Sequence, residues 1–82
     1  MEKRIGVIAI VVEDREKAGD KLNSYLSQFG DIIIGRMGIP YREKNISVIA
    51  LIVDGTTDEI GALTGKLGNL RGVKVKTAFT SK

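Results

Sequence analysis

Two stretches of the sequence, residues 4–12 and 46–53, are apolar at both odd and even positions, and this pattern constrains the fold more than any other feature. Their β-branched residues predict strands. A strand that faces water on one side alternates apolar and polar residues, whereas a strand that is apolar throughout is covered on both faces. Both stretches are therefore expected at the centre of a sheet, packed on two sides.

Helical periodicity follows the first of these strands. Asp14 is a good N-cap, because its carboxylate can accept hydrogen bonds from the free backbone amides of a first turn. Apolar residues then recur on one helical stripe up to Phe29, and Gly30 stands where a left-handed residue ends many helices. These signals predict a helix at about residues 14–29.

A second helix is predicted after residues 54–55, an Asp-Gly pair that is typical of a turn. The spacing of Thr56 and Glu59 fits a capping box, in which each side chain accepts a hydrogen bond from the other residue's backbone amide. An apolar helical stripe follows, and Gly72 closes the segment.

Two further strands are predicted at residues 31–39 and 73–79. Gly35 and Gly38 interrupt the first of them, which indicates a bulge or a close backbone approach. Pro40 follows it and has no amide to donate, so this strand ends there or lies on a sheet edge. The other strand alternates, which is typical of an edge, with its two lysines outward. Its inward residues are expected to be Val73, Val75, Thr77 and Phe79.

The order strand–helix–strand–strand–helix–strand, within one domain of residues 1–82, predicts an α+β fold, the ferredoxin-like βαββαβ sandwich. In that topology two helices cover one face of a four-stranded antiparallel sheet, and the first and third strands are central. The first and third strands of this chain are also its most apolar ones, in agreement with the topology.

Two helices cover only one face of such a sheet, so an apolar face of the central strands is left open. A large exposed apolar patch usually marks an interface, and we expect a homo-oligomer, either a dimer or a tetramer. A lipid or small-molecule groove is the alternative, but no aromatic cluster or convergent polar group accompanies this face. The residues expected at the interface are Ile8, Ile10, Val12, Ile49 and Leu51, or the alternate sets of the same strands.

The chain has no cysteine, histidine or tryptophan, which excludes disulfides, thiolate or imidazole metal sites and cysteine nucleophiles. Helix caps and solvated faces explain its acidic residues, so we expect no enzyme, no metal site and no cofactor. No stretch approaches the ~20 apolar residues that cross a bilayer, and no cleavage site of a signal peptide is recognisable. We therefore expect a cytoplasmic protein without membrane partners.

The net charge is +3, and residues 60–82 carry five basic residues and no acidic one. We interpret this basic end as a solvated surface. No helix-turn-helix, zinc finger or basic arm is present, so no sequence-specific DNA binding is expected.

Three glycines of the second helix, Gly61, Gly65 and Gly68, fall on one narrow face. Each costs nearly 1 kcal/mol relative to alanine in a helix interior. They would allow the close approach of another backbone or a flat ligand, or they would allow tight packing on a neighbouring element of the same subunit.

The most distinctive stretch is Gly-Arg-Met-Gly-Ile-Pro-Tyr-Arg-Glu at 35–43, followed by Val-Asp-Gly-Thr-Thr-Asp-Glu-Ile at 53–60 and Leu-Thr-Gly-Lys-Leu at 63–67. Through these motifs nearly the whole chain resembles the small regulators of the iron-only (FeFe) hydrogenase system. The resemblance implies a non-enzymatic, ACT-like regulatory module, related in fold to the ligand-binding domain of nickel-responsive repressors. A nickel site of the repressor type is excluded, because this chain lacks histidine and cysteine.

The resemblance also implies where a ligand binds, since ACT-like modules bind effectors where the first strand-to-helix turn of one subunit faces another subunit. Acidic residues there suit an amine and arginines suit a carboxylate, so a mixed-charge metabolite is expected. Alternatively, the arginines pair with acids between subunits, and the oligomer is a structural or adaptor protein that binds a further protein. The candidate ligand-binding residues are Glu13, Asp14, Arg36, Gly38, Tyr41 and Arg42.

Overall fold

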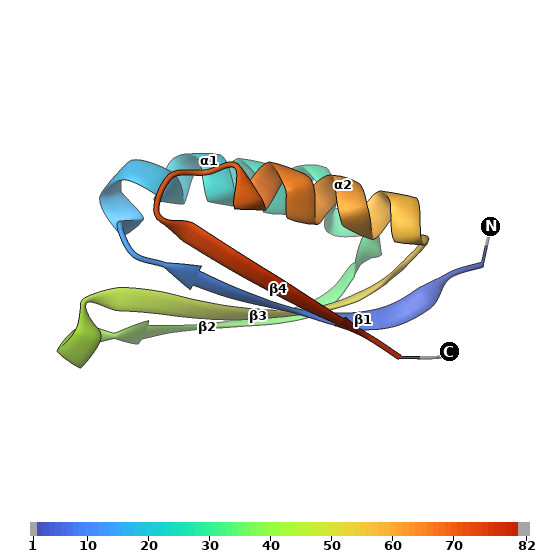
Figure 1. Cartoon of the computed structure of the whole chain (residues 1–82), viewed down its shortest axis with the longest axis horizontal. Coiled ribbons are helices and arrows are strands. Elements are labelled where there is room, and N and C mark those ends of the chain that lie inside the picture. Colours follow the sequence, from blue (N-terminus) through green and yellow to red (C-terminus); the bar gives the residue numbers. More distant parts are fainter. Residues whose placement is uncertain (1, 81–82) are drawn as a thin grey trace.

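The computed structural model describes residues 2–80 and contains one antiparallel sheet with strand order β2-β3-β1-β4. Both long helices lie on the same face of the sheet (Figure 1), which confirms the predicted ferredoxin-like arrangement. The elements, in chain order, are β1 (Arg4–Val12), α1 (Arg15–Gln28), the short 3₁₀ helix η1 (Gly30–Ile32), β2 (Ile33–Tyr41), a second 3₁₀ helix η2 (Arg42–Lys44), β3 (Ile46–Gly55), α2 (Thr57–Gly68) and β4 (Val73–Phe79).

The local signals at the starts of both helices are confirmed. The Asp14 side chain accepts a hydrogen bond from the Lys17 amide at 3.3 Å and caps α1. The capping box of α2 is complete: the Glu59 amide donates to Thr56 Oγ1 at 3.1 Å, and the Thr56 amide donates to Glu59 Oε1 at 2.9 Å. Both helices therefore begin where the sequence places them.

The end of α1 differs from the prediction. Gly30 does not adopt the left-handed conformation, since Gly72 is the glycine with positive φ among the described residues, and Gly30 instead begins η1. The Ile32 amide donates to the Phe29 carbonyl at 3.1 Å, and this turn buries the Ile32 side chain. Because η1 uses these residues, β2 starts at Ile33 and runs to Tyr41 rather than spanning 31–39.

The predicted turn at residues 54–55 is wrong, because Asp54 and Gly55 are the last two residues of β3. Gly55 is buried, and a Cβ atom built on it would lie 3.2 Å from a side-chain carbon of Ile32. The glycine thus allows β3 to pass close to η1, which is a packing requirement rather than a turn.

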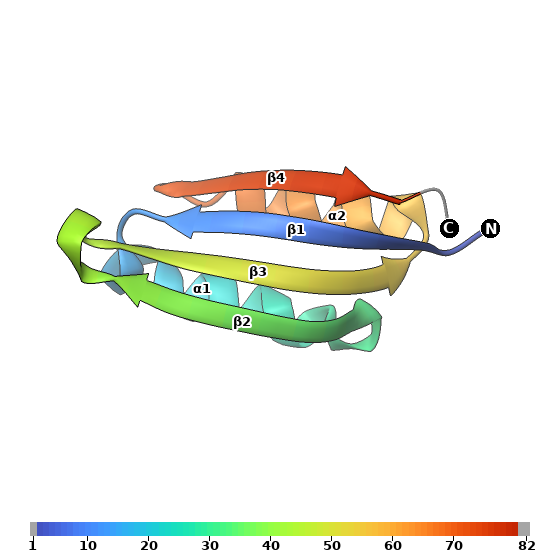
Figure 2. The same cartoon turned by 90° about the horizontal axis from the view of Figure 1, so that it is seen from below.

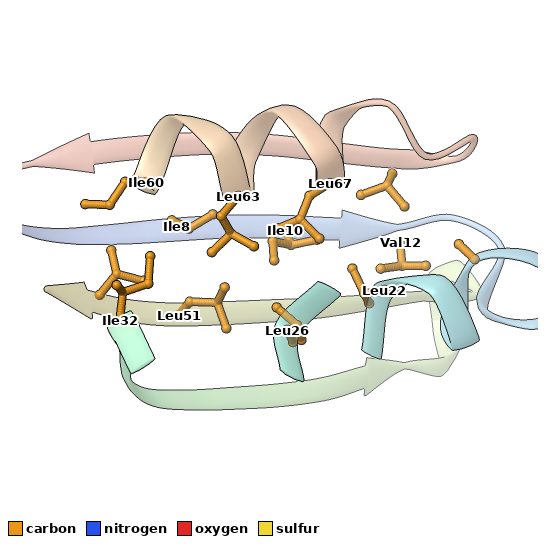
Figure 3. Close-up of a cluster of buried hydrophobic side chains, with 13 residues drawn as sticks. Ile8, Ile10, Val12, Leu22, Leu26, Ile32, Leu51, Ile60, Leu63 and Leu67 are labelled. Atoms are coloured by element: carbon orange, nitrogen blue, oxygen red, sulfur yellow. The ribbon is translucent and has the colours of Figure 1, made fainter. Parts of the chain in front are cut away.

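The core lies between the sheet and the helices, where Ile8, Ile10 and Leu51 are fully buried against α1 and α2 (Figure 3). Val12 is buried with them, and Ile49 packs against this core from β3. The choice of these five residues as interface residues is therefore wrong for the single subunit: they face the helices, and the alternate sets of β1 and β3 face outward.

The face of the sheet opposite the helices is open (Figure 2). The strand register places β1 and β3 residues side by side there, as in the pairs Val7 with Ile52 and Val11 with Val48. We call this surface the open face. Its exposed large side chains are Val7, Met37, Ile39, Tyr41, Val48 and Ile52.

β2 and β4 form the two edges of the sheet, as predicted. A register shift between Ile33 and Gly35 marks the expected irregularity in β2, and Pro40 lies within this edge strand. In β4, Phe79 pairs with Gly6 on the helix side but remains 44% exposed. The expectation that Phe79 is an inward residue therefore holds for its direction and fails for its burial, because an edge strand has a neighbour on one side only.

Candidate functional site

A cavity of about 460 Å³ lies between the turn from β1 to α1 and the hairpin that joins β2 to β3. Both segments sit at the same end of the sheet (Figures 1 and 2). The cavity is lined by Glu13, Asp14, Glu16, Pro40, Arg42, Asn45 and Ile46.

The first wall of the cavity is tied to the opposite edge of the sheet. The Glu13 amide donates to the Gly72 carbonyl at 2.7 Å, and Glu13 Oε1 lies 3.0 Å from Lys74 Nζ. Gly72 has a φ of 77°, a conformation that favours glycine, and a Cβ atom built on it would lie 3.7 Å from the Asp14 backbone nitrogen. The turn from α2 to β4 therefore supports the acidic side of the cavity.

The acidic wall is built around the start of α1. Asp14 is the N-cap and Glu16 is in the first helical turn, where negative charge complements the free amides and the helix dipole. Both residues stabilise the start of the helix, and both line the cavity.

The second wall is the hairpin between β2 and β3. Its turn is η2, which ends at Asn45 in the left-handed conformation with φ 56°, and the Asn45 amide donates to the Arg42 carbonyl at 3.1 Å. Asparagine tolerates this conformation better than most residues. The hairpin thereby brings Arg42 and Pro40 to the same cavity as the acidic residues of the first wall.

The charge distribution of the cavity defines what it can bind. Three acidic residues and one arginine line it, and Asn45 adds an amide that can donate and accept. Glu13 also pairs with Lys74, and the Asp14 carboxylate accepts the Lys17 amide. A ligand with an ammonium and a carboxylate group would find a partner for each, since arginine forms paired hydrogen bonds with carboxylates. No nucleophile–base pair lines this cavity, and no cluster of His, Cys, Asp or Glu within residues 2–80 has the geometry to hold a metal ion.

The predicted ligand-binding residues divide into two groups. Glu13, Asp14 and Arg42 line the cavity together. Arg36 and Gly38 lie further back on β2, opposite Leu51 and Ile49, and do not line it.

Tyr41 belongs to the open face, next to Ile46 of β3. Its ring is 41% exposed, and Lys44 Nζ lies 5.8 Å from the ring centroid. A flat contact for a ligand is therefore available at the end of the hairpin, outside the cavity itself.

Sequence reasoning missed Glu16, Asn45 and Ile46 as lining residues. Asn45 carried a usable signal, because asparagine between two strands favours a left-handed turn position. Glu16 and Ile46 carried none, because their presence at the cavity depends on how the helix and the hairpin meet.

The element order and the strand order define the class of protein, a small α+β domain with a ferredoxin-like, ACT-like fold. Within this class the chain belongs to the TM1266-like family, described as "Iron-only hydrogenase system regulator, putative", whose family model matches residues 4–77. No helix of the described chain is long and apolar enough to cross a membrane.

Solved structures agree with this assignment. The uncharacterized protein TM1266 from Thermotoga maritima is 48% identical, with 98% of this chain and 100% of that chain covered and a TM-score of 0.94. A protein titled as a putative glycine cleavage system transcriptional repressor is 18% identical with a TM-score of 0.71, covering 98% of this chain and 47% of its own.

A PII-like nitrogen regulatory protein from Thiomonas intermedia K12, solved with ADP, AMP and bicarbonate, is 14% identical and has a TM-score of 0.53. It covers 96% of this chain and 92% of its own. These two distant structures share the fold. No match is found among curated protein sequences.

Proposed function

We propose that this chain is a non-enzymatic regulatory module of the iron-only hydrogenase system that binds a small mixed-charge effector in the cavity between the β1–α1 turn and the β2–β3 hairpin. The observation that carries the proposal is that three acidic residues and Arg42 line one cavity. The family description supports a regulatory function, and the proposal places this regulator in the cytoplasm.

The proposed module is a homo-oligomer that assembles through the open face. Val7, Met37, Ile39 and Ile52 are between 45% and 62% exposed there, and such a patch of large apolar residues favours contact with a second copy. The cavity borders the end of β2, next to Tyr41 of the open face, so a second copy on this face would lie close to a bound effector.

The test is native mass spectrometry of the full chain purified from its own cell, which measures the oligomer and any retained small mass together. We expect an oligomer that carries a metabolite, and we expect Arg42→Ala to lose most of the metabolite because the carboxylate partner is removed. Arg4→Ala is the matched control, since Arg4 lies at the far end of β1 and does not line the cavity. Equal retention by both variants, or no retained mass in the wild type, contradicts the effector site.

The alternative function is a structural or adaptor protein without a ligand, in which arginines pair with acids of a second subunit. The exposure of Arg36 on the edge strand β2, outside the cavity, favours this role for that residue. Loss of the oligomer in Arg36→Ala, with no metabolite retained by any form of the protein, would support the alternative.

A further inference from the structure

We infer that the edge of β4 and the glycine face of α2 form a docking groove for an extended, acidic segment of another protein. The groove has a volume of about 740 Å³ and opens at the surface between the helix and the strand. α2 and β4 run side by side at this edge of the molecule (Figures 1 and 2). The groove is lined by Gly61, Thr64, Gly65, Gly68, Val73, Lys74, Val75, Lys76 and Thr77.

The glycines of α2 are not explained by packing within the subunit. A Cβ atom built at Gly61, Gly65 or Gly68 would meet no other atom within 4 Å. Thr64 lies on the same face. Its hydroxyl donates a hydrogen bond to the Gly61 carbonyl at 3.2 Å and therefore needs no partner in the groove. The interpretation of the glycine face as tight packing within the subunit is therefore wrong. The remaining interpretation is the approach of another backbone or a ligand from outside the subunit.

The other wall of the groove is a strand edge. β4 is the last strand of the described sheet on this side, and an edge strand presents backbone N–H and C=O groups that can pair with an added strand. Its helix-side residues Val75 and Thr77 are only half-buried, because α2 carries no side chains beyond hydrogen at its glycine positions. A strand that pairs with the edge of β4 would place every second side chain beside Val75 and Thr77, in the space next to the glycines of α2.

The charge of the β4 edge indicates which kind of segment would bind in the groove. The alternate residues of β4, Lys74 and Lys76, lie on the other face of the strand and are exposed. Lys74 pairs with Glu13 at 3.0 Å, whereas Lys76 makes no ion pair within residues 2–80. A second β4 edge would bring lysine against lysine, and the β2 edge carries Arg36 and lacks a donor at Pro40. A second copy is therefore disfavoured at this edge, whereas a segment alternating acidic and apolar residues matches both Lys76 and the groove.

The probe for the test is a peptide of the length of β4 in which valine and glutamate alternate, titrated into the labelled full chain while NMR amide shifts are followed. We expect shifts confined to β4 and α2. We expect Gly65→Leu, which fills the groove, and Lys76→Glu, which reverses the charge, each to weaken binding about tenfold. The corresponding valine–lysine peptide is expected to bind Lys76→Glu better than the wild type.

Matched controls separate docking from folding. Gly19→Leu makes the same change in α1, where a Cβ atom also meets nothing within 4 Å, and Lys21→Glu makes the same charge reversal on α1. Both are expected to bind the acidic peptide as the wild type does. The inference is overturned if the acidic peptide causes no shifts at millimolar concentration, if the shifts lie outside β4 and α2, or if Gly65→Leu binds unchanged. It does not depend on the effector cavity, which lies at another surface of the subunit.

Discussion

Glu59 links the capping of α2 to the pH dependence of the protein's stability. Its carboxylate accepts the Thr56 amide, and this hydrogen bond, with that of the Thr56 side chain, lowers the pKa of Glu59 below its ordinary value of 4.5. A carboxyl group whose pKa is lower in the folded state stabilises the fold above its unfolded pKa, and that stabilisation is lost as the pH falls through the folded pKa. The start of α2 is therefore a point at which acid weakens the protein.

We predict that Glu59→Gln makes the free energy of unfolding less dependent on pH under acidic conditions. Glutamine keeps the capping box but does not titrate, so the free energy of unfolding should fall less between pH 5 and pH 3 than in the wild type, by about the contribution of one titrating group. Urea unfolding across this pH range measures the effect. If the free energy of unfolding falls equally in both proteins as the pH is lowered, protonation of the capping carboxylate is not coupled to folding.

The candidate ligand-binding residues that line the cavity are those whose positions follow from local sequence. Asp14 is placed by its capping role, and Glu13 precedes it at the end of a strand whose limits the sequence defines. Arg42 lies in the polar connection between two strands, whereas Arg36 was grouped with it by proximity in sequence. The register of β2 against β3 sets the direction of Arg36, and this register cannot be read from the chain alone, although Gly35 indicates the irregularity before it.

At the scale of elements, α2 combines a fully buried face with a face made of glycines. Ile60, Leu63 and Leu67 are completely buried against the sheet, while Gly61 and Gly65 are exposed beside them. The stripe of the buried face was predictable from its period. The openness of the glycine face was not, because it depends on how far the helix stands from β4.

We predict that Gly61→Ala stabilises the protein. No neighbour blocks the added methyl group, and alanine lowers the backbone entropy of the unfolded chain, so the free energy of unfolding should rise by about 0.5–1 kcal/mol. Gly72→Ala is the contrasting variant: its φ of 77° is strained for alanine, and it should lose about 1 kcal/mol. Urea denaturation compares the two, and a loss of stability in Gly61→Ala would mean that the helix face is packed in solution.

For the whole molecule, topology was predictable and the orientation of the central strands was not. The order of elements and the two apolar strands were sufficient to place β1 and β3 at the centre. Both alternate sets of these strands are apolar, however, so the sequence does not indicate which set meets the helices. The lengths of the connections and the packing of α1 and α2 make that choice, and they put Leu51 inside and Ile52 outside.

Leu51 and Ile52 therefore give a direct test of the proposed assembly. Leu51→Ala removes fully buried atoms from the core and should cost about 3 kcal/mol of unfolding free energy, while the folded fraction still assembles. Ile52→Lys changes a side chain that is 47% exposed on the open face, so it should cost the subunit less than about 1 kcal/mol and yet dissociate the oligomer. Sedimentation and light scattering at micromolar concentration measure assembly, and urea unfolding measures stability. If the wild type sediments as a monomer, or Ile52→Lys assembles normally, the open face is not the contact between copies.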